Sequence, residues 1–220
     1  FLELLARSGC KGTLIGFESL NEDNLRAMKK GFNTMSGGYA KALENLYRHH
    51  IRVYATFVFG YEHDTPESFD RAVEFAIEND FYISAFNHLT PFPGTPLYRK
   101  LEEQGRLRFA AWWLDPAYRY NDVPFVPKQL SPQDVTRLCV KARREFYSWK
   151  SILKRGFGRA NRSDAFMFRN FFPINAMHRT DVSKRNGYPL GDEAWSGTLL
   201  EASHELRPIP DHTTSLLRQA

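Results

Sequence analysis

The stretch from Val53 to Ser68 constrains the fold most, because it joins a strand to a helix through a single turn. Its first half is a nearly continuous apolar and β-branched run, which is typical of a strand covered on both faces. Gly60 interrupts the run, Thr65 is a suitable N-cap, and Pro66 suits the first helical position. Loops after the carboxyl ends of parallel strands commonly bind ligands. We therefore predict a site at Phe59 to Asp64, with a purely structural turn as the alternative.

The same pattern recurs on both sides of this unit. Strands are predicted at Gly12 to Ser19 and at Phe81 to Leu89, with helical segments between the three strands. Strands that alternate with helices predict parallel βαβ units whose strand ends lie on one side. Glu18 at the first strand end has two interpretations, a cap for the next helix or a group that holds a polar ligand. The glycine-rich segment at 31–38 follows a helix and lacks the Lys-Ser/Thr of a phosphate loop, so we interpret it as a connector.

The second part of the chain has a different character. An aromatic and proline-rich loop at 111–130 precedes a long helix that begins near Pro132 and has an apolar face reaching Leu153. Its other face is basic, and we interpret it as a solvent-facing surface, with nucleic-acid contact as the alternative. Four aromatic residues of the loop are predicted to fill core, with a place in the substrate pocket as the alternative: Trp112, Trp113, Tyr118 and Tyr120. From Phe172 onward the periodicity fades, which predicts an irregular tail.

Composition limits the class of protein. The 220 residues are enough for one sizeable domain, and no apolar run is long enough to cross a membrane, so the cytoplasm is the expected location. The two cysteines, Cys10 and Cys139, lack metal-ligand spacing and are predicted to be ordinary buried thiols. The net positive charge lies entirely after residue 130. The chain starts with Phe1 in what is predicted to be the end of a helix, so we expect a fragment.

Three phrases at the predicted strand ends resemble a known family. LIGFESLNEDNLRAMKKGFN, TFVFGYEHDTPESF and HLTPFPGTPLYRKLEEQGRL closely resemble, in order and spacing, the second half of the barrel in radical S-adenosylmethionine (SAM) enzymes of the class with a cobalamin-binding domain. The resemblance implies an α/β fold, the C-terminal half of a partial (β/α)6 TIM-like barrel with a mainly helical C-terminal extension. Residues 1–110 would hold the last three βα units. Residues 111–220 would hold the loop, the basic helix and the tail.

The resemblance also implies a set of cofactors. SAM would bind across the strand ends, and a four-iron four-sulfur cluster would cleave it reductively. The CxxxCxxC motif that holds such a cluster is absent from this sequence, so the cluster ligands and the cobalamin domain would lie outside this chain. We therefore expect the fragment alone to be inactive, and we expect its partner to be the N-terminal half of the same enzyme.

Residues that would contact SAM follow from the matched phrases. Glu18 and Ser19 match a position that contacts the ribose or the amino acid end of SAM. A carboxylate suits this contact because ribose hydroxyls and an ammonium group donate hydrogen bonds. The adenine pocket matches the fifth and sixth strand ends, where His63-Asp64-Thr65 replaces the Gly-Glu-Thr of many relatives. The full predicted set is Glu18, Ser19, Thr56, Val58, Phe59, Gly60, Tyr61, Asp64, Asn87, Leu89, Pro91, Phe92 and Pro93.

We therefore hypothesise that the chain is part of a radical SAM enzyme that acts on a small molecule, by methyl transfer or by radical rearrangement. The alternative is a non-catalytic, degenerate barrel domain that binds a nucleotide or a nucleic acid through the basic helix. Such a domain would need a way to cover the open edges of its sheet. None is evident in the sequence, which counts against a standalone domain. We do not expect a nucleic-acid partner, because the aromatic residues of the basic helix already belong to its apolar face.

Overall fold

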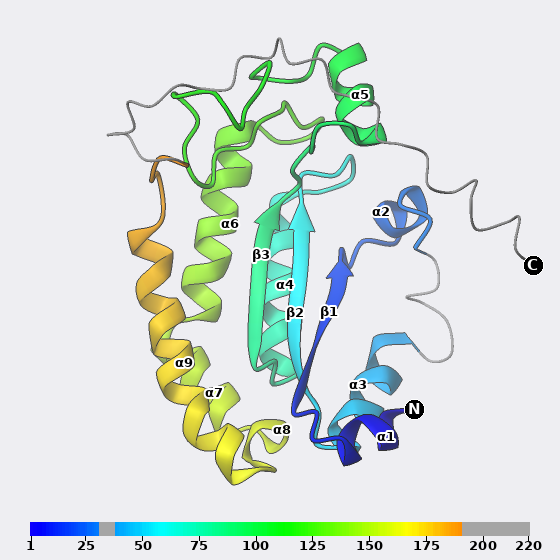
Figure 1. The fold of residues 1–220 in the computed structure, drawn as a ribbon, viewed down its shortest axis with the longest axis vertical. Helices are drawn as coiled ribbons and strands as arrows, with labels where there is room; N and C mark the ends of the chain where they lie inside the picture. Colours follow the sequence, from blue (N-terminus) through cyan, green and yellow to red (C-terminus); the bar gives the residue numbers. More distant parts are fainter. Residues whose placement is uncertain (31–37, 191–220) are drawn as a thin grey trace, which may run out of the picture. The chain divides into compact units, whose positions relative to one another are not determined.

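A three-stranded parallel sheet organises the computed structural model, which describes residues 1–30 and 38–190. The strands are β1 (Gly12–Glu18), β2 (Arg52–Phe59) and β3 (Ile83–His88), in the order β1-β2-β3. Their arrowheads point the same way in Figure 1. The predicted βαβ arrangement is confirmed in this part of the chain, and the connector at 31–37 lies outside the described residues.

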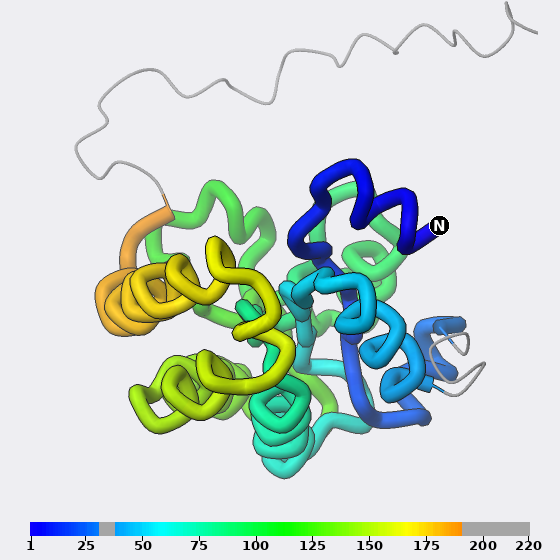
Figure 2. Tube along the Cα trace, turned by 90° about the horizontal axis from the view of Figure 1, so that it is seen from below, coloured from blue at the N-terminus to red at the C-terminus, as the bar shows by residue number. Residues whose placement is uncertain are grey.

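Helices fill the connections and follow the last strand. In chain order they are α1 (Leu2–Arg7), α2 (Glu22–Ala27), α3 (Gly38–Arg48), α4 (Pro66–Glu78), α5 (Pro96–Glu103), α6 (Pro132–Phe146), α7 (Trp149–Gly156), α8 (Arg159–Arg162) and α9 (Ala165–Lys184). Seen from below in Figure 2, α6 and α7 (yellow-green) lie between α4 (teal) and α9 (yellow to orange). None of the helices in residues 1–30 and 38–190 has the length and apolar character to cross a membrane.

The helix α4 begins where its local signals predict. Pro66 is at its first position, and Thr65 and Ser68 form a reciprocal capping box, in which the Ser68 hydroxyl accepts from the Thr65 N–H at 3.1 Å. Its buried face contains Phe69, Ala72 and Val73, which pack toward the sheet. The strand, turn and helix start predicted between Val53 and Ser68 are therefore confirmed.

The sheet is covered on one face by the described residues. In β2, Val53, Ala55 and Phe57 are fully buried, whereas Tyr54 between them is 36% exposed. Leu14 in β1 is 61% exposed. The prediction that both faces of β2 are covered was wrong for this part of the chain, because α4 and α6 pack against only one face. The apolar run in the sequence does not distinguish the two cases.

The long helix predicted after Pro132 is two helices. Its break lies at Tyr147 and Ser148, where the Ser148 hydroxyl accepts from the Ser151 N–H at 3.2 Å and caps α7. Tyr147 leaves the helical axis and donates its hydroxyl to the Ser84 carbonyl of β3 at 2.9 Å. The apolar periodicity continues across the break, which is why the sequence suggested one helix.

The irregular tail predicted from Phe172 was also wrong as far as Lys184. The helix α9 continues through Pro173, which is exposed. Asn175 is buried and donates to the Phe171 carbonyl at 2.9 Å and to the Tyr82 carbonyl at 3.2 Å, which ties the helix to the start of β3. Residues 191–220, including the stretch after Leu206, lie outside the described residues.

Side chains cover the outer edge of β3, where no strand pairs in the described chain. Arg143 donates to the Phe86 carbonyl at 2.9 Å, and Tyr147 pairs with both backbone groups of Ser84. Arg155 donates to the Phe81 carbonyl at 2.8 Å, just before the strand. The sequence showed no device to cover an open edge, but at β3 the following helices provide one.

Arg155 is the most buried cation of this arrangement, with no exposed surface. It also donates to the Phe146 carbonyl at 2.9 Å, to Asn175 at 3.0 Å and to the Ser151 hydroxyl at 3.0 Å, and its guanidinium lies 3.7 Å from the Phe146 ring centroid. Burial lowers the pKa of Arg155 to about 9, and its partners are neutral acceptors. The predicted solvent-facing basic surface therefore needs correction, because Arg155 and the half-buried Arg143 point inward.

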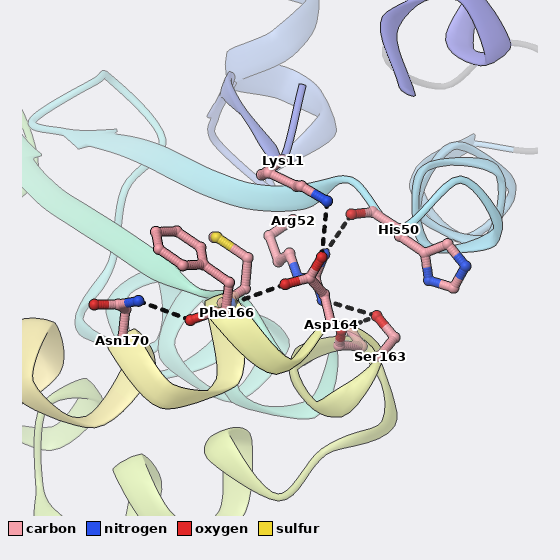
Figure 3. Close-up of polar contacts among 9 residues, drawn as sticks. Lys11, His50, Arg52, Ser163, Asp164, Phe166 and Asn170 are labelled. Atoms are coloured by element: carbon pink, nitrogen blue, oxygen red, sulfur yellow. Dashed lines mark hydrogen bonds and ion pairs between the residues drawn. The ribbon is translucent and has the colours of Figure 1, made fainter. Parts of the chain in front are cut away.

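A second polar cluster fixes the same end of the sheet, where β1 and β2 begin (Figure 3). Lys11 forms a 2.8 Å ion pair with Asp164, which also caps α9 through the Met167 N–H. Arg52 at the start of β2 donates to the Ser163 hydroxyl at 2.9 Å. The hydrogen bond and the charge of Lys11 help to lower the pKa of Asp164 to about 2. The beginning of α9 is thereby joined to the beginnings of β1 and β2.

Replacing Arg155 with Met should destabilise the protein by about 3 kcal/mol or more, because several buried acceptors lose their donor together. Urea denaturation followed by circular dichroism measures the change. Arg144→Met on the exposed side of α6 is the matched control and should change stability by less than about 0.5 kcal/mol. Equal effects of the two substitutions would show that the Arg155 contacts contribute nothing specific.

Candidate functional site

The candidate site is the end of the sheet at which the three parallel strands finish, at Glu18, Phe59 and His88. The pairing aligns Val58 with Asn87 and Gly16 with Thr56, so their backbones are neighbours across the strands. The even-numbered β2 residues Thr56 and Val58 are half-buried and lie on the face opposite the core. The ends of the strands and this open face therefore form one surface.

Glu18 occupies an irregular position at the end of β1. The strand register shifts between Gly16 and Glu18, and Glu18 has a left-handed φ of 61°. Its carboxylate accepts from Lys30 at 2.7 Å and its side chain is 20% exposed. A Cβ on Gly16 would lie 2.7 Å from the Glu18 carboxylate, so glycine there leaves room for the acid to fold back over the strand.

Glu18 does not cap the next helix, which was one of its two interpretations. Asn21 is the N-cap of α2, and its side chain accepts from the Asp23 and Asn24 N–H groups. The Glu18 carboxylate instead lies near Tyr61, whose pKa burial raises to about 12, with a further contribution from the negative charges of Glu18 and Asp64. The partner of the Glu18 carboxylate is Lys30 and not the helix α2.

Ser19 and Asp64 face inward and are bonded to the protein itself. The Asp64 carboxylate is 1% exposed and accepts from the Gly60 N–H at 2.8 Å, the Tyr61 N–H at 2.9 Å and the Asn24 amide at 2.8 Å. The Ser19 hydroxyl accepts from the Asn21 N–H at 3.1 Å. These side chains hold the loop after β2 against α2, so their contribution to a site is to position it.

Gly60 is required by both conformation and space. Its φ is 106°, and a Cβ there would lie 3.2 Å from the Phe125 ring. The close neighbour of Gly60 is therefore an aromatic residue of the loop before α6. Phe59 beside it is 2% exposed and stacks on Phe69 with centroids 3.9 Å apart, so its ring belongs to the core and not to the open face.

The end of β3 and the segment after it present a more exposed surface. Asn87 is exposed, and its side-chain oxygen accepts from Arg143 at 3.1 Å. The Leu89 N–H donates to the Phe59 carbonyl at 2.7 Å, which continues the pairing with β2. Pro91 is buried, Phe92 is 58% exposed, and Pro93 is exposed. The Trp112 indole donates to the Pro91 carbonyl at 2.9 Å and so fixes this segment.

Four contributors to this region were missed from the sequence: Lys30, Asn24, Trp112 as an anchor, and Arg143. Each meets its partner only when distant segments come together, so no local pattern indicates the pair. Of the four loop aromatics predicted as core, Tyr118 is 4% exposed and Trp112 is half-buried. Trp113 and Tyr120 are each 37% exposed, so the core prediction was wrong for these two.

Metal-ligating side chains do not gather in the described residues, where no group of three or more His, Cys, Asp or Glu could hold an ion. Cys139 is fully buried, as predicted, and burial raises its pKa to about 12. Cys10 is only partly buried. The polar side chains at the strand ends include the carboxylate of Glu18, the imidazole of His88 and the amide of Asn87, which suit a polar organic ligand.

Asp64 gives a test of this geometry through pH. Burial raises its pKa from 3.8 to about 6, so the folded protein holds the proton more tightly than the unfolded chain. The stability from this proton is complete below pH 3.8 and is lost as the pH rises through about 6. Relative to Asp64→Asn, the wild type should lose about 1–3 kcal/mol of unfolding free energy between about pH 4 and pH 7.

Urea denaturation at several pH values measures this difference. Asp64→Asn should be less stable than the wild type at every pH, because its NH2 group takes the place of a carboxylate oxygen that accepts a hydrogen bond. The diagnostic quantity is the difference between the two proteins in the slope of unfolding free energy against pH. Asp23→Asn, which removes an exposed carboxylate of α2, should keep the wild-type slope. Parallel curves for all three proteins would contradict the elevated pKa of Asp64.

Comparison with known proteins identifies methyltransferases as relatives, although no family model matches the chain. It is 37% identical over 157 residues to the bacteriochlorophyllide d C-12(1)-methyltransferase of Chlorobaculum tepidum, covering 71% of this chain and 33% of that protein. It is 30% identical over 153 residues to the C-8(2)-methyltransferase of the same organism, covering 69% and 33%. The hopanoid C-2 methylase of Rhodopseudomonas palustris is 27% identical over 106 residues, covering 48% and 20%.

The chain is thus homologous to methyltransferase enzymes and spans about a third of the length of the first two relatives. This finding corrects the family identification made from the sequence, which was the C-terminal half of a radical SAM enzyme with a cobalamin-binding domain. The relatives are named for methyl transfer, and the matched part is 33% of their length and not half. That identification also left methyl transfer as one of several possible reactions.

Proposed function

We propose that this chain is part of a longer methyltransferase that uses SAM and acts on a large, apolar ring compound. The placement of Glu18 carries the proposal, because this acid ends the parallel strand β1, is 20% exposed, and folds back over Gly16, which pairs with Thr56 of β2. Such a carboxylate can accept from ribose hydroxyls or from an ammonium group. The names of the relatives, which include bacteriochlorophyllide and hopanoid methylases, support both the reaction and the ring substrate.

We further propose radical chemistry for the methyl transfer, with a four-iron four-sulfur cluster and cobalamin bound outside this chain. When bound, these groups supply reductive cleavage of SAM and carriage of the methyl group. The role of this chain's residues would be to bind and orient SAM.

The proposed architecture is a partial (β/α)6 barrel in which residues 1–110 form the last three units and residues 111–220 the helical extension. Within the described chain, β1 is an edge strand, and Leu14 and Tyr54 on the open face are exposed. Earlier strands of the complete protein would pair with β1 and enclose this face. The partner of the chain would then be the preceding part of the same enzyme.

The residues proposed to form the SAM site divide into two groups by their position in the fold. Glu18, Thr56, Val58, Tyr61 and Asn87 lie on the open face or at its edge and would contact the ligand directly. The second group would shape the pocket from behind, and it comprises Ser19, Phe59, Gly60, Asp64, Leu89 and Pro91. Phe92 and Pro93 are exposed and would border the adenine.

The nucleic-acid alternative receives little support from the basic helix. Arg143 and Arg155 are used inside the fold, Lys141 pairs with Asp70 at 2.7 Å, and Arg137 pairs with Asp134 at 2.9 Å. The charge left to attract a phosphate backbone is therefore smaller than the sequence suggests. A steep loss of nucleic-acid affinity with salt would still revive this alternative.

The first test uses the complete polypeptide that contains this chain, expressed without oxygen and supplied with SAM and a reductant. We expect bound iron and cobalamin, formation of 5′-deoxyadenosine, and label from methyl-labelled SAM in the product. A protein that neither binds nor cleaves SAM would contradict the proposal.

Glu18→Gln tests the residue that carries it. We expect SAM affinity to fall roughly tenfold, because the neutral amide loses a charge-assisted hydrogen bond. Equilibrium dialysis with labelled SAM measures the dissociation constant. Glu22→Gln, which changes an exposed acid at the start of α2, is the control and should leave it unchanged. Equal affinities for wild type and Glu18→Gln would remove Glu18 from the site.

A further inference from the structure

A hollow of about 400 Å³ lies beside the proposed SAM face. It is bordered by the open side of β2 and β3, by the loop residues Tyr120 and Asn121, and by the second half of α9. Figure 1 shows α9 running beside α6 on the β3 side of the sheet. Asn87, which belongs to the proposed SAM face, also lines the hollow. A ligand in the hollow would therefore adjoin bound SAM.

Several polar groups at the hollow have unused hydrogen-bonding capacity within the described chain. The His178 ring stacks on Tyr147, with centroids 5.2 Å apart and an angle of 17° between the planes, and it forms no hydrogen bond to a described residue. The buried hydroxyl of Ser84, which also lines the hollow, has no hydrogen-bond partner among residues 1–30 and 38–190. Burial lowers the pKa of His178, so at neutral pH its imidazole presents one donor and one acceptor.

The hollow has an excess of positive charge. Arg143 bonds only to neutral groups: the Phe86 carbonyl at 2.9 Å, Asn121 at 2.7 Å and Asn87 at 3.1 Å. Arg185 lies 3.5 Å from Asp181, which is the one acid that lines the hollow. Two guanidinium groups therefore face a single carboxylate, which favours an anionic ligand group.

Aromatic and thioether surfaces form the rest of the wall. Tyr54 is 36% exposed, Tyr120 37% and Met177 59%. Phenol rings and a flexible thioether favour a flat, apolar partner, while the arginine groups favour a carboxylate. The volume is smaller than a large ring compound, so it fits one edge of such a molecule.

We propose that this hollow binds the carboxylate-bearing edge of a flat ring substrate, with Tyr54 and Tyr120 against the ring and Arg185 and His178 at the carboxylate. This inference rests on the proposed function, because it takes the ring compound as the acceptor of the methyl group from SAM. It assigns substrate recognition to α9, a helix that lies outside the proposed βα units.

The test measures binding of pyropheophorbide a, a chlorin with one free carboxylate, and of its methyl ester, by fluorescence quenching of the complete polypeptide. Arg185→Gln should weaken binding of the acid roughly fivefold to tenfold and leave binding of the ester unchanged, because only the acid has a charge to lose. Lys184→Gln, one residue earlier and exposed, is the matched control and should change neither. His178→Phe keeps the stacking on Tyr147 and should also weaken the acid selectively.

Several outcomes would overturn the proposal. They are an equal change for acid and ester in Arg185→Gln, an equal loss in Lys184→Gln, or no binding of either chlorin to a wild type that binds SAM. Circular dichroism of each variant separates loss of fold from loss of binding, and Tyr120→Leu gives a second probe of the ring contact. SAM binding is measured on the same samples. Acid-selective chlorin binding without SAM binding would sink the proposed methyl transfer and leave the ligand class of the hollow standing.

Discussion

The unpaired edge of β3 is the constraint on which the rest of the structure depends. A strand edge in the interior needs donors and acceptors for its backbone groups, and no further strand of the described chain supplies them. Arg143, Tyr147, Arg155 and Asn175 do so from three helices. Each side chain reaches its backbone partner only if its helix lies at a particular position along the strand. The position of α6, α7 and α9 therefore follows from satisfying this edge.

This arrangement has a consequence for the proposed substrate site. The contacts of Asn175 with Tyr82, together with those of Asp164 with Lys11 and of Ser163 with Arg52, hold α9 against the end of the sheet where the strands begin. His178 of α9 and Arg185, which follows the helix, then line the hollow together with Asn87. A structural requirement of the edge strand thus positions a helix that brings polar side chains to the hollow.

The sheet divides structural and functional roles between its two faces. Core residues such as Phe57 and Phe59 fill one face, whereas Thr56, Val58 and Tyr54 remain available on the other. The loop after β2 is stabilised separately, because Asp64 satisfies the N–H groups of Gly60 and Tyr61. This internal support leaves Glu18 and Tyr61 at the surface of the strand ends, where a polar ligand can reach them.

Local chemistry in the sequence determined the three strands, the turn at Gly60 and the start of α4, because strand runs, glycine and capping residues act on their immediate neighbours. It also placed Glu18, Gly60 and Asn87 at one end of the sheet, since the carboxyl ends of parallel strands lie together. Tertiary structure alone decided which face of β2 is covered, that Asp64 and Phe59 turn inward, and that Arg143 and Arg155 serve the interior. Those outcomes depend on contacts between distant segments, and a basic or apolar residue has the same local pattern whether its partner is water, a backbone carbonyl or a ligand.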